Sequence, residues 1–429
     1  MAAGHLSTYD RATVSPRVSS SFLNLWLAIP GNLYRFERFE ASDAVVIYGF
    51  HNFSLGVRFQ PMLTSSDSSS TTLRGSILAP IQFDVCEEIR LELLQEIIEA
   101  RPVAQPTLKY SATAYIRYER PPLVEPTETL VLESGERIQA QIKYYDYGVL
   151  SVVFQLPFEG DWETVIHLAG RWLGDVDFAD RASRIVRQKL AIATPALVKP
   201  YPKRLSEDYF IFHVREIDGS PTADQLIHRH GPQIAQIVRR EVAELAQSEC
   251  DEVLQSHMSY YPNDLAVIGW NAAFIYDSAP GAETSIQLLE HANSQLLQFR
   301  HYDAVLSEEL VRVYKSFEKG TGIWARWRLA RSATGLHTAM LDVMELSEHA
   351  ENAIKFLGDT FSARLYKLAE SKIGVPDYKT LVTQKMRTAE ELYGFMVSQF
   401  NKSRGFILEV TVVVILIIEL LRGIVPILR

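Results

Sequence analysis

The sequence predicts an α+β globular body, then an all-α antiparallel helical hairpin of coiled-coil type, and then one C-terminal transmembrane helix. Short runs of β-branched and aromatic residues alternate with helical patterns up to about residue 281. Beyond that point apolar residues recur at alternating spacings of four and three, and an apolar run follows. We therefore expect an N-terminal arm at 1–40, an α+β domain at 41–281, a helical stalk at 282–405 and an anchor at 406–428.

The composition is that of a globular protein of two or three domains. The 429 residues are 47% hydrophobic and 22% charged, with a net charge of −9. An acidic chain of this kind binds nucleic acid only through a local basic patch. Its two cysteines, Cys86 and Cys250, exclude a disulfide-stapled scaffold and a cysteine-rich zinc site. The common catalytic motifs are absent, and we expect no enzymatic activity, no catalytic or metal-binding residues and no cofactor.

Strand and helix patterns alternate through the body. Residues 84–100 read as a helix, because apolar residues recur every four positions and Arg101-Pro102 ends the pattern. A further helical pattern covers 161–193, and another covers 224–258. A strand–helix–strand order occurs twice, which indicates two similar halves. The predicted strands are at 44–50, 77–83, 107–118, 142–155, 209–214 and 265–276.

The stalk is predicted from heptad spacing. Apolar residues share one face over 336–368, Gly374-Val375-Pro376 breaks the pattern, and the same spacing resumes over 382–421. Two long helices joined by a short turn predict an antiparallel hairpin. The second helix presents a seam that one arm does not cover fully, so we expect a homo-oligomer. The seam residues are Met386, Tyr393, Met396 and Phe400.

The run Phe406–Leu428 has about the length that a membrane span needs. Its centre, Val410–Ile418, contains Thr411 as its one polar residue. Glu409, Glu419 and Arg422 speak against a span, because a charge within the bilayer is costly. The alternative is a helix buried in a soluble bundle.

Three groups of residues are candidates for chemistry. Trp324, Arg326, Trp327, Arg328 and Arg331 form a basic-aromatic cluster that suits lipid headgroups, RNA phosphates or an acidic partner. The alternative is a helix start with tryptophans in the core and arginines in solvent.

The other two groups are favoured as structural. His228 and His230 point apart on a helix and lack a further ligand at fixed spacing, which favours a solvated face over a metal site. Glu290, His301 and Asp303 suit acid–base catalysis. Ion pairs that lock a helix bundle are the favoured alternative.

Several motifs resemble the required-for-meiotic-nuclear-division family. They are Tyr145–Leu150 with an aromatic-x-Tyr-Gly pattern, Ala246–Ser248, Gln295–Asp303, the runs 351–355, 358–359 and 363–366, and Tyr393, Asn401, Arg404 and Glu409. The resemblance covers about residues 140–421. The chain departs from the family at Glu249-Cys250-Asp251, where an apolar run is expected, and shows no signature before residue 140. The resemblance implies a membrane-anchored protein of unknown chemistry, with mitochondrial members that support translation at the inner membrane.

We therefore expect a non-enzymatic, membrane-tethered scaffold that oligomerises and recruits a partner, with a link to translation at the membrane. The expected partners are further copies of the chain, a lipid bilayer through Phe406–Leu428, and a protein or a ribosome or other RNA. The expected location is a membrane with the body on the cytoplasmic side, or the mitochondrial inner membrane with the body in the matrix. The alternative is a membrane-bound enzyme with an unrecognised site in the α+β domain.

Overall fold

The computed structural model forms two compact units, Met1–Ser68 and Ser69–Arg429. It describes residues 24–29, 32–38, 45–50, 71–98, 100–102, 115–118, 120–127, 129–132, 135, 137–174, 177–318, 323–352, 354–357 and 360–424. In the first unit, β1 (Asn24–Ile29), β2 (Asn32–Arg38) and β3 (Val45–Phe50) form an antiparallel sheet in that order. The strand predicted at 44–50 is thus confirmed as β3.

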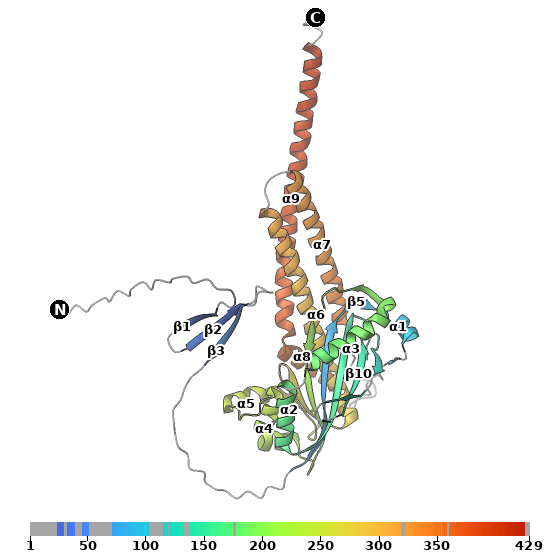
Figure 1. Cartoon of the computed structure of the whole chain (residues 1–429), viewed down its shortest axis with the longest axis vertical. Helices are drawn as coiled ribbons and strands as arrows, with labels where there is room; N and C mark the ends of the chain where they lie inside the picture. Colours follow the sequence, from blue (N-terminus) through green and yellow to red (C-terminus); the bar gives the residue numbers. More distant parts are fainter. Residues whose placement is uncertain are drawn as a thin grey trace, which may run out of the picture. The chain divides into compact units, whose positions relative to one another are not determined.

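The second unit is built on an eleven-stranded mixed sheet (Figure 1). Its path is β15-β16-β17-β14-β4-β11-β10-β8-β6, with β13 beside β4 and β9 beside β10. The bounds are β4 Leu73–Asp84, β6 Arg101–Pro102, β8 Leu123–Pro126, β9 Leu130–Val131, β10 Arg137–Tyr144, β11 Val149–Gly160, β13 Ser206–Asp208, β14 Phe210–Ile217, β15 His257–Met258, β16 Leu265–Ile268 and β17 Ala272–Tyr276.

The two sides of the central strands serve two different cores. Successive side chains of a strand point to opposite faces. Phe154 of β11 packs with α2 (Trp162–Gly174), α3 (Phe178–Ala193), α4 (Ala223–Arg239) and α5 (Gln247–Leu254). Its neighbour Val153 packs with α6 (Ala279–Glu318) and α8 (Thr360–Ile373). The sheet therefore lies between two helical layers, and α6 belongs to the second.

Helices α6, α7 (Ile323–Asn352) and α9 (Val375–Ile424) form a three-helix bundle. Helices α6 and α9 run parallel, since Asp303 pairs with Lys385 and, further along, Phe317 contacts Phe395. Helix α7 runs back antiparallel to both and packs against each of them (Figure 1). The apolar core of the bundle consists of Leu310, Val313, Ala333, Leu336, Met340, Ala389 and Met396.

The structure confirms helices in the predicted stalk, but these helices do not form the predicted two-helix hairpin. The helix expected over 336–368 ends at Asn352, and β18 (Ile354–Leu357) follows it and pairs with β7 (Tyr115–Tyr118). The break at Gly374 is confirmed, and its φ of 93° suits glycine because side chains clash there. A third helix, α6, completes the bundle.

Two predictions in the body also need correction. The helix expected at 84–100 begins instead as β5 (Cys86–Ile89), which pairs with β12 (Leu197–Pro200), and only α1 (Leu91–Ile97) is helical. The local apolar periodicity indicates a helix, but residues 86–89 form a strand because they pair with β12, more than a hundred residues later. A sequence pattern does not reveal such a distant partner. The strands expected at 142–155 and 265–276 are hairpins. In the strand expected at 107–118, residues 107–114 lie outside the described part of the chain.

Among the helices in the described residues, none combines the length and the apolar character that a membrane span requires. Residues 425–428 of the predicted segment lie outside the described part of the chain. The transmembrane helix predicted at 406–428 is therefore not supported.

Candidate functional site

Residues 287–299 of α6 are buried on all sides, although this part of the helix is rich in polar residues. It lies between the sheet and α8, so that even its polar side chains are shielded from solvent. Buried polar groups must find hydrogen-bond partners inside the protein. The buried polar residues are Thr284, Gln287, Glu290, His291, Asn293, Ser294, Gln295 and Gln298. We call their contact zone with the sheet the polar layer.

An ion pair occupies the centre of the polar layer. The Lys143 ammonium on β10 donates to both carboxylate oxygens of Glu290, with Nζ–Oε distances of 2.8 and 2.6 Å. The hydroxyl of Tyr145 donates to the same carboxylate over 3.1 Å. The exposed fractions of the two charged side chains are 10% and 1%. A pair so desolvated is costly to break, because either charge alone would be buried without compensation.

A second set of hydrogen bonds holds the backbone of α6 against β4. Gln82 Nε2 donates to the carbonyl oxygen of Glu290 over 2.8 Å. The side-chain oxygen of Gln82 accepts from Asn293 Nδ2 over 2.9 Å. One strand side chain thus contacts two turns of the helix and fixes the register of helix on sheet.

The turn between β10 and β11 supplies the third set. Tyr147 Oη lies 3.3 Å from His291 Nδ1 and 3.0 Å from Ser294 Oγ, and the Tyr147 carbonyl accepts from Gln298. The turn depends on Gly148, whose φ is 84° and whose missing Cβ would lie 1.9 Å from the Cys86 carbonyl oxygen. Burial lowers the pKa of His291 to about 3, so this imidazole is neutral at physiological pH.

At the far end of the layer, Asp84 meets His301. Asp84 Oδ2 lies 3.3 Å from His301 Nδ1, yet it has no hydrogen-bond partner among the described residues. The imidazole stacks on Tyr201 at 4.2 Å between ring centroids. Burial raises the pKa of Asp84 well above its usual value and lowers the pKa of His301 to about 4. Both groups are therefore driven towards their neutral forms.

Perturbed titratable groups often mark active sites, but reactive chemistry also requires access. Two concave regions of the described residues, one along α2 and one between α6 and α7, are lined by other residues than those of the polar layer. The described residues also contain no group of three or more His, Cys, Asp or Glu side chains that could hold a metal ion. The polar layer is suited to holding α6 on the sheet in one register.

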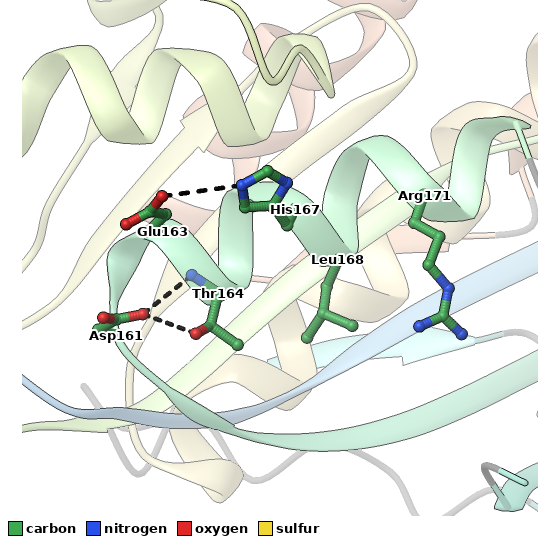
Figure 2. Close-up of a pocket in the computed structure, with 6 residues that line it drawn as sticks. All are labelled: Asp161, Glu163, Thr164, His167, Leu168 and Arg171. Atoms are coloured by element: carbon green, nitrogen blue, oxygen red, sulfur yellow. Dashed lines mark hydrogen bonds and ion pairs between the residues drawn. The ribbon is translucent and has the colours of Figure 1, made fainter. Parts of the chain in front are cut away.

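The first concave region is a shallow hollow of about 400 Å³ along α2 (Figure 2). Asp161 accepts hydrogen bonds from the backbone N–H and the hydroxyl of Thr164, at 2.9 and 2.6 Å. These bonds lower the pKa of Asp161. Glu163 and His167 form an exposed pair 3.9 Å apart. Such an arrangement caps a helix and brings no reactive groups together.

The second concave region is a groove of about 790 Å³ between α6 and α7. Arg331 of the predicted basic-aromatic cluster lines this groove and is exposed. Trp324, Arg326, Trp327 and Arg328 belong to the first turns of α7, but their side chains lie outside the described ones. Recognition by this cluster stays a prediction.

The residues predicted as an oligomer seam lie largely within the chain's own bundle. Met396 is fully buried, and Met386 and Tyr393 pack partly buried against the same core. Tyr393 also stacks on His337 at 4.8 Å. The side chain of Phe400 is outside the described ones. Helices α6 and α7 thus cover this part of α9, which the hairpin prediction left partly uncovered.

The predicted acid–base group is divided among separate partners. Glu290 pairs with Lys143, His301 contacts Asp84, and Asp303 pairs with Lys385. This agrees with the alternative of helix-locking ion pairs. His230 is not at a metal site in the described structure and stacks on Trp162 at 4.5 Å.

Sequence reasoning missed the sheet side of the polar layer, namely Gln82, Asp84 and Lys143. A signal was present for Gln82 and Asp84, which follow the apolar run of β4, but not for Lys143, which continues the polar–apolar alternation of β10. A polar residue at a core-facing strand position needs a partner, but the sequence does not say where that partner lies.

Comparisons with known proteins find a domain of unknown function. The family model of the N-terminal domain of "Uncharacterized protein MJ0711" matches residues 74–283. The uncharacterized protein MJ0711 of Methanocaldococcus jannaschii is 21% identical over 198 residues, which are 46% of this chain and 61% of the relative. The match thus spans less than two thirds of that protein. No solved structure matches.

The matched region runs from β4 to the start of α6. It contains the sheet side of the polar layer and ends before Glu290. These comparisons support a domain of unknown function and do not extend to the required-for-meiotic-nuclear-division family.

Proposed function

We propose that the protein is a non-enzymatic scaffold that assembles with further copies of itself through the end of α9. The observation that carries this proposal is an apolar helix segment in solvent. Val412–Ile418 are seven consecutive apolar residues, and their exposed fractions lie between 47% and 58%. Figure 1 shows this end of α9 continuing beyond the helices α6 and α7.

The heptad seam of α9 explains why another copy suits this segment. Met396 on the seam is buried by α6 and α7, whereas Val414 and Ile417, at the same spacing further along, are 47% and 52% exposed. The seam thus continues after its intramolecular partners end. Equivalent helices of other copies can extend the packing in the same geometry.

The assembly is expected to contain more than two copies. Successive helix residues are about 100° apart, so seven of them point in every direction around the axis. One partner helix covers a single stripe and leaves the remaining apolar side in water. A helix that is apolar all round is normally surrounded.

The filled polar layer favours a scaffold over the alternative of an enzyme. Asp84, His291 and His301, whose pKa values are strongly shifted by burial, are packed between sheet and helix and line neither concave region. Membership of the required-for-meiotic-nuclear-division family, a membrane location, recruitment of a further partner and a link to translation stay predictions from the sequence. Self-association does not depend on them.

The test is sedimentation velocity of the purified full chain. We expect an assembly larger than a dimer at micromolar concentration, and monomers for the double variant Val414→Asp and Ile417→Asp. The control is the double variant Leu381→Asp and Val397→Asp, which introduces the same two charges at exposed positions of α9 alongside the bundle. It should assemble like the unchanged chain.

Two results would overturn the proposal. One is an unchanged chain that sediments as a monomer, including the case in which it instead floats with lipid vesicles, since lipid would then be what covers the segment. The other is an assembly that persists in the doubly charged variant.

A further inference from the structure

The groove between α6 and α7 combines a cationic rim with a floor of small residues. Its floor includes Val305, Gly335 and Ala339. Lys315 and Arg331 are exposed on its rim, one from each helix. Its volume of about 790 Å³ lies in the range of sites for small molecules.

The groove has an excess of positive charge once its ion pairs are considered. The lining contains the cations Arg312, Lys315 and Arg331 and the acids Glu309 and Asp342. Arg312 is shared between Glu309 at 2.5 Å and Glu308 at 3.6 Å. Asp342 lies 3.7 Å from Lys199 of β12, which is closer to Glu87. Among the described residues, Lys315 and Arg331 have no ion-pair partner, so their charge is available to a ligand.

The sequence that contributes these cations is locally basic. Between residues 312 and 331 the chain has six basic residues and one acidic residue, whereas its overall net charge is −9. Of the six, Arg312, Lys315 and Arg331 line the groove. A local basic region in an acidic protein attracts anions and not cations.

We propose that this groove binds a small polyphosphate ligand of the nucleotide class. Ammonium and guanidinium groups are the side chains that recognise phosphate oxygens, and guanidinium can do so with two parallel hydrogen bonds. Lys315 and Arg331 contact the phosphates from opposite sides of the groove. The apolar floor receives the uncharged part of the ligand. This proposal is independent of self-association, because the groove lies between α6 and α7 and not on the end of α9.

The experiment is isothermal titration calorimetry of the full chain with ATP and with inorganic tripolyphosphate. The double variant Lys315→Gln and Arg331→Gln should bind both at least about tenfold more weakly, because two charge-assisted contacts are lost. The charge-retaining variant Lys315→Arg and Arg331→Lys should keep most of the affinity. The control, Arg184→Gln and Arg387→Gln, removes the same charge from exposed sites on α3 and α9 and should change binding less than about twofold.

ATP and tripolyphosphate both carry three phosphates, but only ATP has an uncharged part that can contact the apolar floor. We therefore expect ATP to bind more tightly than tripolyphosphate. The proposal is overturned if neither ligand binds at about 1 mM. It is overturned equally if the control loses as much affinity as the groove variant, since general charge would then explain the binding. Binding to anionic lipid vesicles without binding of either soluble ligand would assign the cations to a membrane surface instead.

Discussion

The two halves of α6 are held by different kinds of interaction. The half from Ala279 to about His301 packs on the sheet through hydrogen bonds and a buried ion pair. The half that follows packs in the bundle through apolar side chains such as Leu310 and Val313. One continuous helix therefore passes from a contact with many buried side-chain hydrogen bonds and a buried ion pair to a contact made mainly by apolar side chains.

The difference indicates what each contact can contribute. Apolar packing is non-directional and follows the area removed from water, so it tolerates adjustment of the helix. A buried hydrogen-bonded layer has one satisfied arrangement, because a shift by one turn leaves charges and amides without partners. We infer that the polar layer sets the position of α6 on the body, and that α6 carries this position into the bundle.

The largest expected effect comes from breaking the ion pair of the polar layer. Glu290→Gln keeps the shape of the side chain but leaves the Lys143 ammonium buried without an opposite charge. We expect a loss of about 3–5 kcal/mol in the free energy of unfolding, measured by urea denaturation. Replacing both partners, as in Lys143→Met with Glu290→Gln, should recover part of this loss. A loss below about 1 kcal/mol in the single variant would mean that water or a shifted side chain relieves the buried charge.

A similarly conservative change in the bundle should have a smaller effect. Met396 is fully buried among α6, α7 and α9. Met396→Leu conserves volume and apolar character, so we expect a cost below about 1.5 kcal/mol in the same measurement. If this variant is as destabilised as Glu290→Gln, the two halves of α6 do not differ in specificity, and the comparison fails.

The sequence predicts the apolar packing of the bundle better than the polar contacts between α6 and the sheet. Heptad spacing identified Met386, Tyr393 and Met396 as packing residues of α9, because apolar periodicity is local information. It did not identify α6 as their partner, and it extended α7 through the residues of β18, whose pairing with β7 is non-local. In the polar layer, sequence reasoning placed Glu290 and His301 on one helix and favoured ion pairs. Their partners Lys143 and Asp84 come from strands more than a hundred residues earlier, where spacing carries no information.

The last prediction concerns Asp84, which sharpens the comparison because it is the one carboxylate of the layer with an oxygen left unpaired among the described residues. Burial raises its pKa well above the usual value, so the folded state binds a proton that the unfolded state has already released. Stability should therefore fall as pH rises above the unfolded pKa of about 4, until the folded pKa is passed. Asp84→Asn mimics the protonated form and has no such loss.

The difference in stability between Asp84→Asn and the unchanged chain should therefore favour the variant and grow from acidic to alkaline pH. Urea denaturation at a series of pH values measures it. His301, whose pKa is lowered to about 4 by burial, titrates in both chains and contributes in the opposite sense, with stability falling as pH drops below its unfolded value. Subtracting the two curves removes the part of this contribution that does not depend on the contact between His301 and Asp84. A difference in stability that is constant with pH would show that Asp84 keeps an ordinary pKa in the folded protein. A difference that increasingly favours the unchanged chain as pH rises would show that the charged carboxylate has a partner. Either result would place Asp84 with Glu290 among the carboxylates of the layer whose charge the folded protein accommodates.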